Sequence, residues 1–283
     1  MKKLKRFLLK IAKESQSLAL NYREEFLLNK NVKTKKDDSI VTEADISISK
    51  YLQSNIKAYM KKNKEEDYIY LDEELTSNSS LSIIDNSEYT WIIDPIDGTL
   101  NYACGLNTYA ISISLFKKGK PYAAIIMLPS RNEIYMSIKD KFYFYDLTFN
   151  RNRNFAYKHA KITEQTKNNF YIFSSFFFTK NNKIDRGALI TSRSSVINGL
   201  TTIDGSSLAS IERVCIWDNA AIFVLAKSVG IKFFNLETGK EIKKFKSKYF
   251  ENSDIKRWFW KFETILIKKK NLSLVKNLIK RNK

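Results

Sequence analysis

The sequence has few of the cysteine and histidine residues on which disulfide-bonded folds, zinc sites and several kinds of catalytic centre depend. Its 283 residues include two cysteines, three prolines, eight glycines and one histidine. Cys104 and Cys215 lie far apart without partners at metal-ligand spacing, which excludes a disulfide framework or a zinc site. The single histidine, His159, is a poor basis for Ser-His-Asp or Cys-His catalysis and is expected at the surface. With 43% hydrophobic residues, we expect a soluble, folded protein of the reducing cytoplasm.

Long hydrophobic runs are absent as well. The first residues, MKKLKRFLLKIAKESQ, begin like a signal peptide, but Lys10, Lys13 and Glu14 interrupt the apolar stretch. No run approaches the roughly 18 apolar residues that a membrane span requires. Glycine patterns of the GxxxxGK or GxGxxG kind do not occur. The sequence therefore predicts no membrane partner and neither a P-loop nor a Rossmann nucleotide site.

Acidic residues are scarce only at the two ends of the chain. The sequence holds 49 Lys+Arg against 30 Asp+Glu, a net charge of +19, and residues 1–36 and 240–283 carry this excess while the middle is neutral. Basic ends suit either a nucleic-acid or acidic surface, or a lysine-rich solvated surface. Because no nucleic-acid-binding signature accompanies them, the second interpretation is favoured and nucleic acid is not an expected partner.

The periodicity of apolar residues predicts a mixed α and β protein. Helical spacing predicts amphipathic helices over 4–28 and 44–62. Between residues 109 and 145, β-rich runs separated by turns predict an antiparallel meander. Beyond a soft boundary near residue 150, strands and helices alternate, with strands expected at 170–173, 188–191, 231–235 and 264–268 and helices at 219–228 and 272–281. We thus expect an N-terminal α+β part, residues 1–150, and a C-terminal α/β part, residues 151–283.

The most informative local feature is the segment Trp91-Ile-Ile-Asp-Pro-Ile-Asp-Gly-Thr99. A buried strand ends at Asp94, Pro95 breaks it, and Asp97 follows at a turn, so two carboxylates meet at one point. Gly98 and Thr99 then open a short helix whose free N–H groups can hold an anion. Paired carboxylates beside an anion cradle suit Mg²⁺ with a phosphate, although Asp-Pro and Asp-Gly are also ordinary turn formers.

Three further acidic segments lie at the ends of predicted elements, two at the start of a helix and one after a strand. They are Val41-Thr-Glu-Ala-Asp45, Asp72-Glu73-Glu74 and Trp217-Asp-Asn-Ala-Ala221. Each alone is better explained as a helix N-cap or a solvated loop. Together with the first segment they favour a metal-dependent phosphate site.

These segments, with Asp204-Gly-Ser-Ser207, resemble in kind and order the motifs of the inositol monophosphatase-like superfamily over residues 35–240. The resemblance implies a layered αβαβα sandwich and a lithium-sensitive phosphomonoesterase using two or three Mg²⁺ ions. It implies metal ligands at Glu73, Asp94, Asp97, Asp218 and the Ile96 carbonyl. A homodimer is usual in that family.

The resemblance also implies roles for further residues. Asp45 and Thr99 resemble the pair that orients and deprotonates the attacking water, and Glu73 joins them as a catalytic residue. Gly98 and Thr99 would hold the phosphate through their backbone N–H groups. Gly205 and Ser206, with Glu212 as an acidic contact, would meet the substrate.

The sequence departs from the family between Gly205-Ser-Ser207 and Trp217. Only nine residues remain there, where family members place a helix and a strand, so a shortened substrate wall is expected over 208–216. We favour inositol monophosphate or a sugar phosphate as the substrate. The alternative is a 3′(2′),5′-bisphosphate nucleotide, because Ser192-Arg-Ser194 is more similar to the nucleotidase branch of the family. A different class of function, a binding or regulatory protein that engages RNA or an acidic partner through the basic ends, is disfavoured by the retained carboxylates.

Overall fold

A computed structural model describes most of the chain. The described residues are 1–29, 33–34, 40–75, 81–148, 151–153, 171–174, 183–184, 187–253 and 258–280. The site of His159 and the predicted boundary near residue 150 lie outside them, so the division into two parts stays a prediction. Among the described residues, no helix is long and apolar enough to cross a membrane.

Seven strands form the first sheet, in the spatial order β3-β4-β5-β6-β7-β8-β9. β3 and β4 are parallel, and every later neighbour pair is antiparallel, which confirms the predicted meander. The strands are β3 (Tyr68–Asp72), β4 (Tyr89–Asp97), β5 (Ala110–Lys117), β6 (Lys120–Leu128), β7 (Glu133–Ile138), β8 (Lys141–Asp146) and β9 (Arg151–Arg153).

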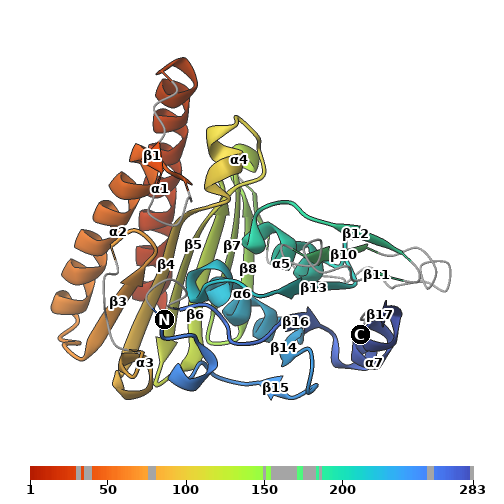
Figure 1. The fold of residues 1–283 in the computed structure, drawn as a ribbon. Helices are drawn as coiled ribbons and strands as arrows, with labels where there is room; N and C mark the ends of the chain where they lie inside the picture. The colour runs from red at the N-terminus through yellow and green to blue at the C-terminus, as the bar shows by residue number, and fades with distance from the viewer. Residues whose placement is uncertain are drawn as a thin grey trace.

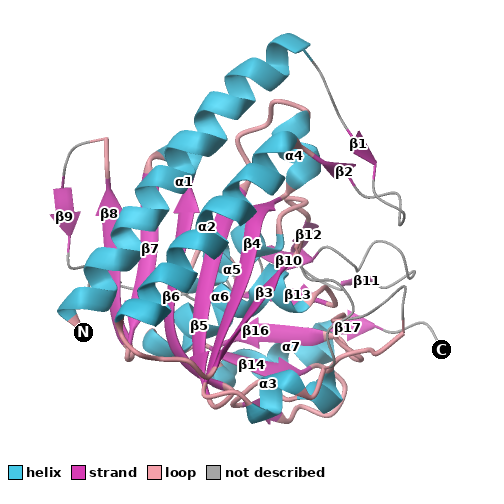
Figure 2. Ribbon diagram, turned by 90° about the vertical axis from the view of Figure 1, so that its left-hand side faces the viewer, coloured by secondary structure: helices cyan, strands magenta, loops and turns pink. Residues whose placement is uncertain are grey.

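Two long helices cover one face of this sheet. α1 (Lys2–Asn29) and α2 (Glu43–Lys62) lie side by side across it, as Figure 2 shows. Their apolar stripes, which include Leu8 and Ile11 on α1 and Ile48 and Leu52 on α2, are buried against the apolar side chains of β4 to β7. Both predicted amphipathic helices are therefore confirmed. The polar segment between them contains β1 (Lys33–Thr34) and β2 (Ile40–Val41).

A second, six-stranded sheet takes its strands from the C-terminal half, in the order β12-β10-β13-β16-β14-β15. The strands are β10 (Tyr171–Ser174), β12 (Ala188–Ile190), β13 (Ala209–Glu212), β14 (Lys232–Asn235), β15 (Glu241–Ile242) and β16 (Thr264–Ile267). β11 (Lys183–Ile184) pairs separately with β17 (Ile279–Lys280). The helices are α3 (Ile83–Asn86), α4 (Thr99–Ala103), α5 (Ser195–Asp204), α6 (Ile216–Ser228) and α7 (Leu272–Leu278).

Helices α5 and α6 lie between the two sheets (Figure 1). One continuous apolar core joins the first sheet to these helices and to Phe233 and Leu266 of the second sheet. On the other face of the second sheet, Val275 of α7 packs with Ile265 and Ile267. The layers thus run helix, sheet, helix, sheet, helix, which confirms the expected αβαβα fold.

The segment 208–216 contains one strand, β13, and no helix, while the helix α5 lies upstream of Gly205. Gly205 ends that helix in a left-handed conformation, with φ of 85°. The shortened substrate wall over 208–216 therefore stays a prediction.

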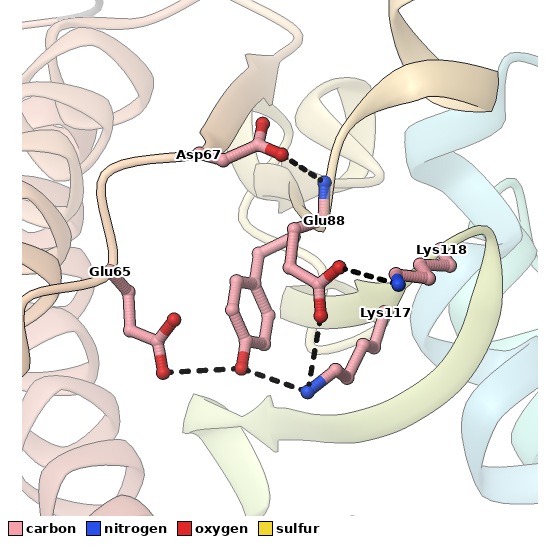
Figure 3. Close-up of polar contacts among 6 residues, drawn as sticks. Glu65, Asp67, Glu88, Lys117 and Lys118 are labelled. Atoms are coloured by element: carbon pink, nitrogen blue, oxygen red, sulfur yellow. Dashed lines mark hydrogen bonds and ion pairs between the residues drawn. The ribbon is translucent and has the colours of Figure 1, made fainter.

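A polar network fixes the end of β4 that is remote from Asp94 (Figure 3). The Glu88 carboxylate pairs with Lys117 at 3.2 Å and with Lys118 at 3.1 Å. The Glu88 N–H donates to Asp67, and Lys117 donates to the Tyr89 hydroxyl. At about 3.3 Å per strand residue, Glu88 lies roughly 20 Å from Asp94, so it offers a control position outside the site.

Candidate active site

A one-residue bulge in β4 brings Asp94 and Asp97 together. Asp94 is opposite Ser112 on β5 and Asp97 is opposite Ala110, so three residues advance on one strand against two on the other. In a regular strand, residues three apart point to opposite faces, and one extra residue restores a common side. Pro95 lies inside this bulge, where a missing N–H costs no ladder hydrogen bond. The strand therefore continues through Pro95 to Asp97, where the sequence predicted a break.

Three carboxylates from three elements converge at this point. Glu73 follows β3, Asp94 lies on β4, and Asp218 lies in the first turn of α6; each offers one oxygen, and these oxygens are all within 4.8 Å of one another. Both Asp94 oxygens are buried without a hydrogen-bond partner in the described structure. Burying an unpaired carboxylate is costly unless a cation neutralises it. The donor set is all oxygen and therefore fits a hard divalent cation such as Mg²⁺.

The electrostatics of the cluster agree with its geometry. Burial, reinforced by the charges of Glu73, Asp97 and Asp218, raises the pKa of Asp94 well above its ordinary value. Burial and the charges of Asp97 and Glu73 likewise raise the pKa of Asp218, although the Cys215 N–H donates to it at 2.7 Å. Carboxylates that resist ionisation in one place indicate a site built for a positive charge.

Asp97 faces the N-terminus of α5. It accepts hydrogen bonds from the backbone N–H groups of Ser195 (3.2 Å) and Val196 (2.9 Å) and from the Ser194 hydroxyl. Burial raises its pKa to about 7, against the opposing effect of these three donors. Asp97 thus joins the first sheet to α5, the helix that lies between the two sheets, beside the three-carboxylate cluster.

Replacing Ser194 should loosen this junction. Ser194 is the N-cap of α5, and its hydroxyl both accepts from the Ile197 N–H and donates to Asp97. We expect Ser194→Ala to lower the free energy of unfolding by about 1 kcal/mol, since both contacts are lost. Thermal denaturation measures this, with Ser194→Thr as the control that keeps the hydroxyl. Equal melting temperatures for the two variants would contradict the role given to that hydroxyl.

Thr99 lies between Asp45 and the Ile96 carbonyl. Its hydroxyl oxygen is 3.0 Å from the Ile96 carbonyl oxygen and 3.4 Å from Asp45 Oδ1. A hydroxyl has one proton and can donate to only one of them at a time. The other Asp45 oxygen accepts from the N–H and hydroxyl of Thr42, which closes the capping box of α2. Asp45 and Thr99 are therefore in contact, as the sequence predicted.

Asp72 supports Glu73 from the adjacent position. Its buried carboxylate accepts from the Ser49 and Tyr70 hydroxyls, both at 2.8 Å, and from the N–H groups of Glu74 (2.8 Å) and Leu75 (3.2 Å). These bonds fix the turn that carries Glu73. Burial nevertheless raises the pKa of Asp72, although all four bonds oppose the shift.

Gly98 occupies a crowded left-handed position, with φ of 86°. A Cβ atom there would lie 3.1 Å from the Thr108 carbonyl oxygen and 3.2 Å from Ser194 Cβ. Glycine is therefore required for the approach of the loop before α5. The first N–H groups of α4, at Thr99, follow directly and have no partner within that helix.

The residues predicted to contact the substrate divide into two groups. Glu212 on β13 is buried and accepts from Asn198 at 2.8 Å and Ser210 at 3.2 Å, and its charge acts on Asp218. Gly205 and Ser206 lie at the C-terminal end of α5, whose ten residues span about 15 Å from the end that meets Asp97. The structure does not bring these two residues to the carboxylates, and we leave them out of the site.

The segment that does reach the carboxylates entered the sequence analysis only as Ser192-Arg-Ser194, for its bearing on the choice of substrate, and was not predicted to be part of the site. It is Ser192–Val196, where the loop leads into α5. The available signal was a serine N-cap followed by apolar residues at positions 196, 197, 200 and 203, a helical pattern that the Gly-Ser-Ser further on obscured.

Relatives with related sequences match short parts of this chain. A Nus factor SuhB of Xylella fastidiosa is 46% identical over 50 residues, 18% of each chain. A fructose-1,6-bisphosphatase of Pyrococcus furiosus is 42% identical over 62 residues, 22% of this chain and 24% of its own. In such relatives the matched segment spans only about a fifth of their length.

Solved structures match over nearly the whole chain. An extragenic suppressor protein SuhB of Bartonella henselae has a TM-score of 0.70 at 18% identity, covering 98% of both chains. An IMPase/NADP phosphatase complexed with Mg²⁺ and phosphate has the same TM-score and identity, covering 99% of this chain and 96% of its own. These likenesses establish the fold. Together with the match of residues 1–256 to the family model described as the inositol monophosphatase family, they lead to one conclusion: this chain belongs to the inositol monophosphatase family.

Proposed function

We propose that this protein is a metal-dependent phosphomonoesterase that hydrolyses a small phosphorylated polyol, inositol monophosphate or a sugar phosphate. The observation that carries the proposal is the buried, unpartnered carboxylate of Asp94 among the oxygens of Glu73 and Asp218. Family membership and a fold shared with a phosphatase complexed with Mg²⁺ and phosphate support it. A cation bound to this cluster would neutralise the carboxylates, so that an anionic phosphate could bind beside them.

Glu73, Asp94, Asp97, Asp218 and the Ile96 carbonyl would hold two or three Mg²⁺ ions. When bound, these ions supply charge neutralisation of the phosphate and lower the pKa of the attacking water. With the Ile96 carbonyl engaged, the Thr99 hydroxyl would donate to Asp45 instead. A metal ion and the Thr99 hydroxyl would thus compete for the Ile96 carbonyl oxygen, and a bound ion would direct the Thr99 proton towards Asp45.

The chain's own residues would then guide the water. The Thr99 hydroxyl would take the proton that the water loses as it attacks, and would pass its own proton to Asp45. Because the Thr42 N–H and hydroxyl occupy the other Asp45 oxygen, the carboxylate cannot rotate away. The N–H groups of Gly98 and Thr99 hold the phosphate, and Glu212 faces a hydroxyl group of the leaving polyol.

The activity test is Mg²⁺-dependent phosphate release from inositol 1-phosphate and sugar phosphates, with and without Li⁺. We expect release that EDTA and Li⁺ suppress. Thr99→Ala should lower kcat by about 10² to 10⁴, because it removes the group that orients and deprotonates the water, whereas Thr99→Ser keeps the hydroxyl and most of the activity.

Glu88→Gln, at the far end of β4, is the control for folding and handling. Equal activity of Thr99→Ala and the wild type would sink the proposed role of Thr99. Failure of the wild type to release phosphate from any substrate would sink the phosphatase, and salt-sensitive retention of RNA would then favour the binding-protein alternative.

Two further properties belong to the same proposal. A free, exposed Cys104 and a free, buried Cys215 suit the reducing cytoplasm. We also propose a homodimer, because members of the family are usually homodimers. Analytical ultracentrifugation of the purified protein tests this oligomeric state.

A further inference from the structure

Helices α1 and α2, which lie side by side in Figure 2, leave a groove between them with a volume of about 570 Å³. Small-molecule sites occupy roughly 300–1,000 Å³, so a small ligand would fit. Phe7 on α1 stacks on Tyr59 on α2 with ring centroids 4.1 Å apart, and these half-buried rings are part of the groove lining. The walls also carry four cationic side chains, Lys3, Arg6 and Lys10 from α1 and Lys62 from α2.

These four cations have no counter-charge in the described part of the structure. None of their side chains forms a hydrogen bond or an ion pair there, and no acid is among the described residues that line the groove. Lys3, Arg6 and Lys10 are three and four residues apart on one face of α1, where like charges repel one another. Lys5 of the same helix is held differently, because its ammonium lies 3.8 Å from the centre of the Tyr143 ring. The row of charges is therefore unfavourable for the helix alone, and a bound anion would offset the repulsion.

Acidic residues follow the cations at both ends of the groove. Glu14 comes one helical turn after Lys10, and burial and the charge of Glu14 together raise the pKa of Tyr51 on α2. Beyond Lys62, the chain continues into Glu65-Glu66-Asp67. Between these acids, the cations of α1 extend over about 10 Å of the helix axis. The positive surface therefore suits a short, compact polyanion, whereas a long nucleic-acid strand or a flat lipid surface would also meet the acids.

We propose that this groove binds a nucleoside triphosphate, with the phosphates on the four cations and the base against the rings of Phe7 and Tyr59. A triphosphate concentrates several negative charges in one compact group, which matches the unbalanced cations. Hydrogen bonds from lysine and arginine to phosphate are charge-assisted, and a guanidinium can donate two in parallel. Aromatic side chains hold a base by stacking, whichever base it is. The groove offers both kinds of contact, and a free phosphate would use only one of them.

The groove is separate from the candidate active site. The Phe7 ring meets Trp91 on β4 edge-on, with centroids 6.3 Å apart, so the groove lies over that face of the first sheet. Asp94 follows three residues later on the same strand, and residues three apart in a strand point to opposite faces. A ligand bound between α1 and α2 therefore does not reach the carboxylates, and the proposal does not depend on the phosphatase function.

Titration calorimetry of ATP in EDTA measures this binding. Without divalent cations the carboxylates of the candidate active site repel phosphate, so the heat reports the groove. Lys3→Gln/Lys62→Gln, which removes one charge from each wall, should weaken ATP binding by about tenfold or more. Lys2→Gln/Lys61→Gln is the matched control, because these exposed lysines are the sequence neighbours outside the groove lining. Their charges are screened by solvent, and their loss should change the affinity by less than about twofold. All four positions are exposed, so circular dichroism should show unchanged helix content.

Ligands that lack one part of ATP test the two kinds of contact separately. We expect tripolyphosphate to bind at least about fivefold more weakly than ATP because it lacks the base, and adenosine more weakly still because it lacks the charge. Absence of ATP binding, an affinity for tripolyphosphate equal to that for ATP, or equal losses in the two double variants would each overturn the proposal. A short single-stranded RNA that binds more tightly than ATP and is weakened equally by both double variants would identify a general basic surface, and would overturn it as well.

Discussion

Asp94→Asn should abolish phosphate release and at the same time raise the melting temperature of the metal-free protein. The Asp94 carboxylate is buried without a hydrogen-bond partner among the described residues, next to the charges of Glu73 and Asp218. Removing the charge of Asp94 relieves the repulsion between the carboxylates, which no cation neutralises in the metal-free protein. The same change removes a ligand oxygen from the cluster, so we expect kcat to fall by at least about a thousandfold.

Differential scanning calorimetry with and without Mg²⁺ measures the second half of this prediction. The wild type should gain about 2.7 kcal/mol of stability when Mg²⁺ is present at a hundred times its dissociation constant, and Asp94→Asn should gain far less. Glu88→Gln is the matched control and should respond to Mg²⁺ like the wild type. If Asp94→Asn lowers the stability of the metal-free protein, Asp94 serves the fold and the metal assignment fails.

The metal-free protein should lose stability as the pH rises from about 4 to above 7. In the folded state burial raises the pKa of Asp97 to about 7 and the pKa values of Asp94 and Asp218 well above their ordinary values. Because the folded protein then holds protons that the unfolded chain has released, the stability contributed by these groups is complete below the unfolded pKa, near 4. It disappears as the pH passes through the folded values. The shift of Asp97 alone corresponds to a loss on the order of a few kcal/mol.

Chemical denaturation at pH 5 and pH 8 tests this dependence. Saturating Mg²⁺ should remove most of the difference, because a bound cation favours the ionised carboxylates that the metal-free protein resists forming. Asp94→Asn should show a smaller pH dependence than the wild type. A metal-free protein that is more stable at pH 8 than at pH 5 would contradict the repulsion within this cluster.

The outer parts of the fold follow from the sequence because their periodicity is strong. The helix predicted over residues 44–62 is α2, Glu43–Lys62, and the runs between 109 and 145 are β5 to β8. In these elements apolar spacing, turn residues and local propensity agree, and this holds even for the central strands β5 and β6, which are buried on both faces. The predicted C-terminal helix over 272–281 ends earlier, at Leu278, because Ile279 and Lys280 pair with β11.

The helix missed in the sequence, α5, depends on tertiary packing. It contains Gly199, two threonines and an asparagine, which lower its intrinsic helix propensity. A Cβ at Gly199 would lie 2.6 Å from Ile222 on α6, so the glycine allows close contact between the two helices. Packing against α6 stabilises α5, and this contact cannot be recognised from the local sequence pattern of α5.

For the site, the sequence by itself determined which acids are present, and in which order they follow the ends of the strands. The segments that carry Glu73, Asp94 and Asp218 could be recognised locally, because strand ends and helix starts carry characteristic residues, and the resemblance to the family implied that these three are metal ligands. Only the tertiary structure decided which groups meet: the bulge at Pro95 aligns Asp97, and the N-terminus of α5 brings Ser194 to it. The physical reason is that a motif fixes a side chain's place within its own element, whereas contacts between distant segments depend on how whole layers pack.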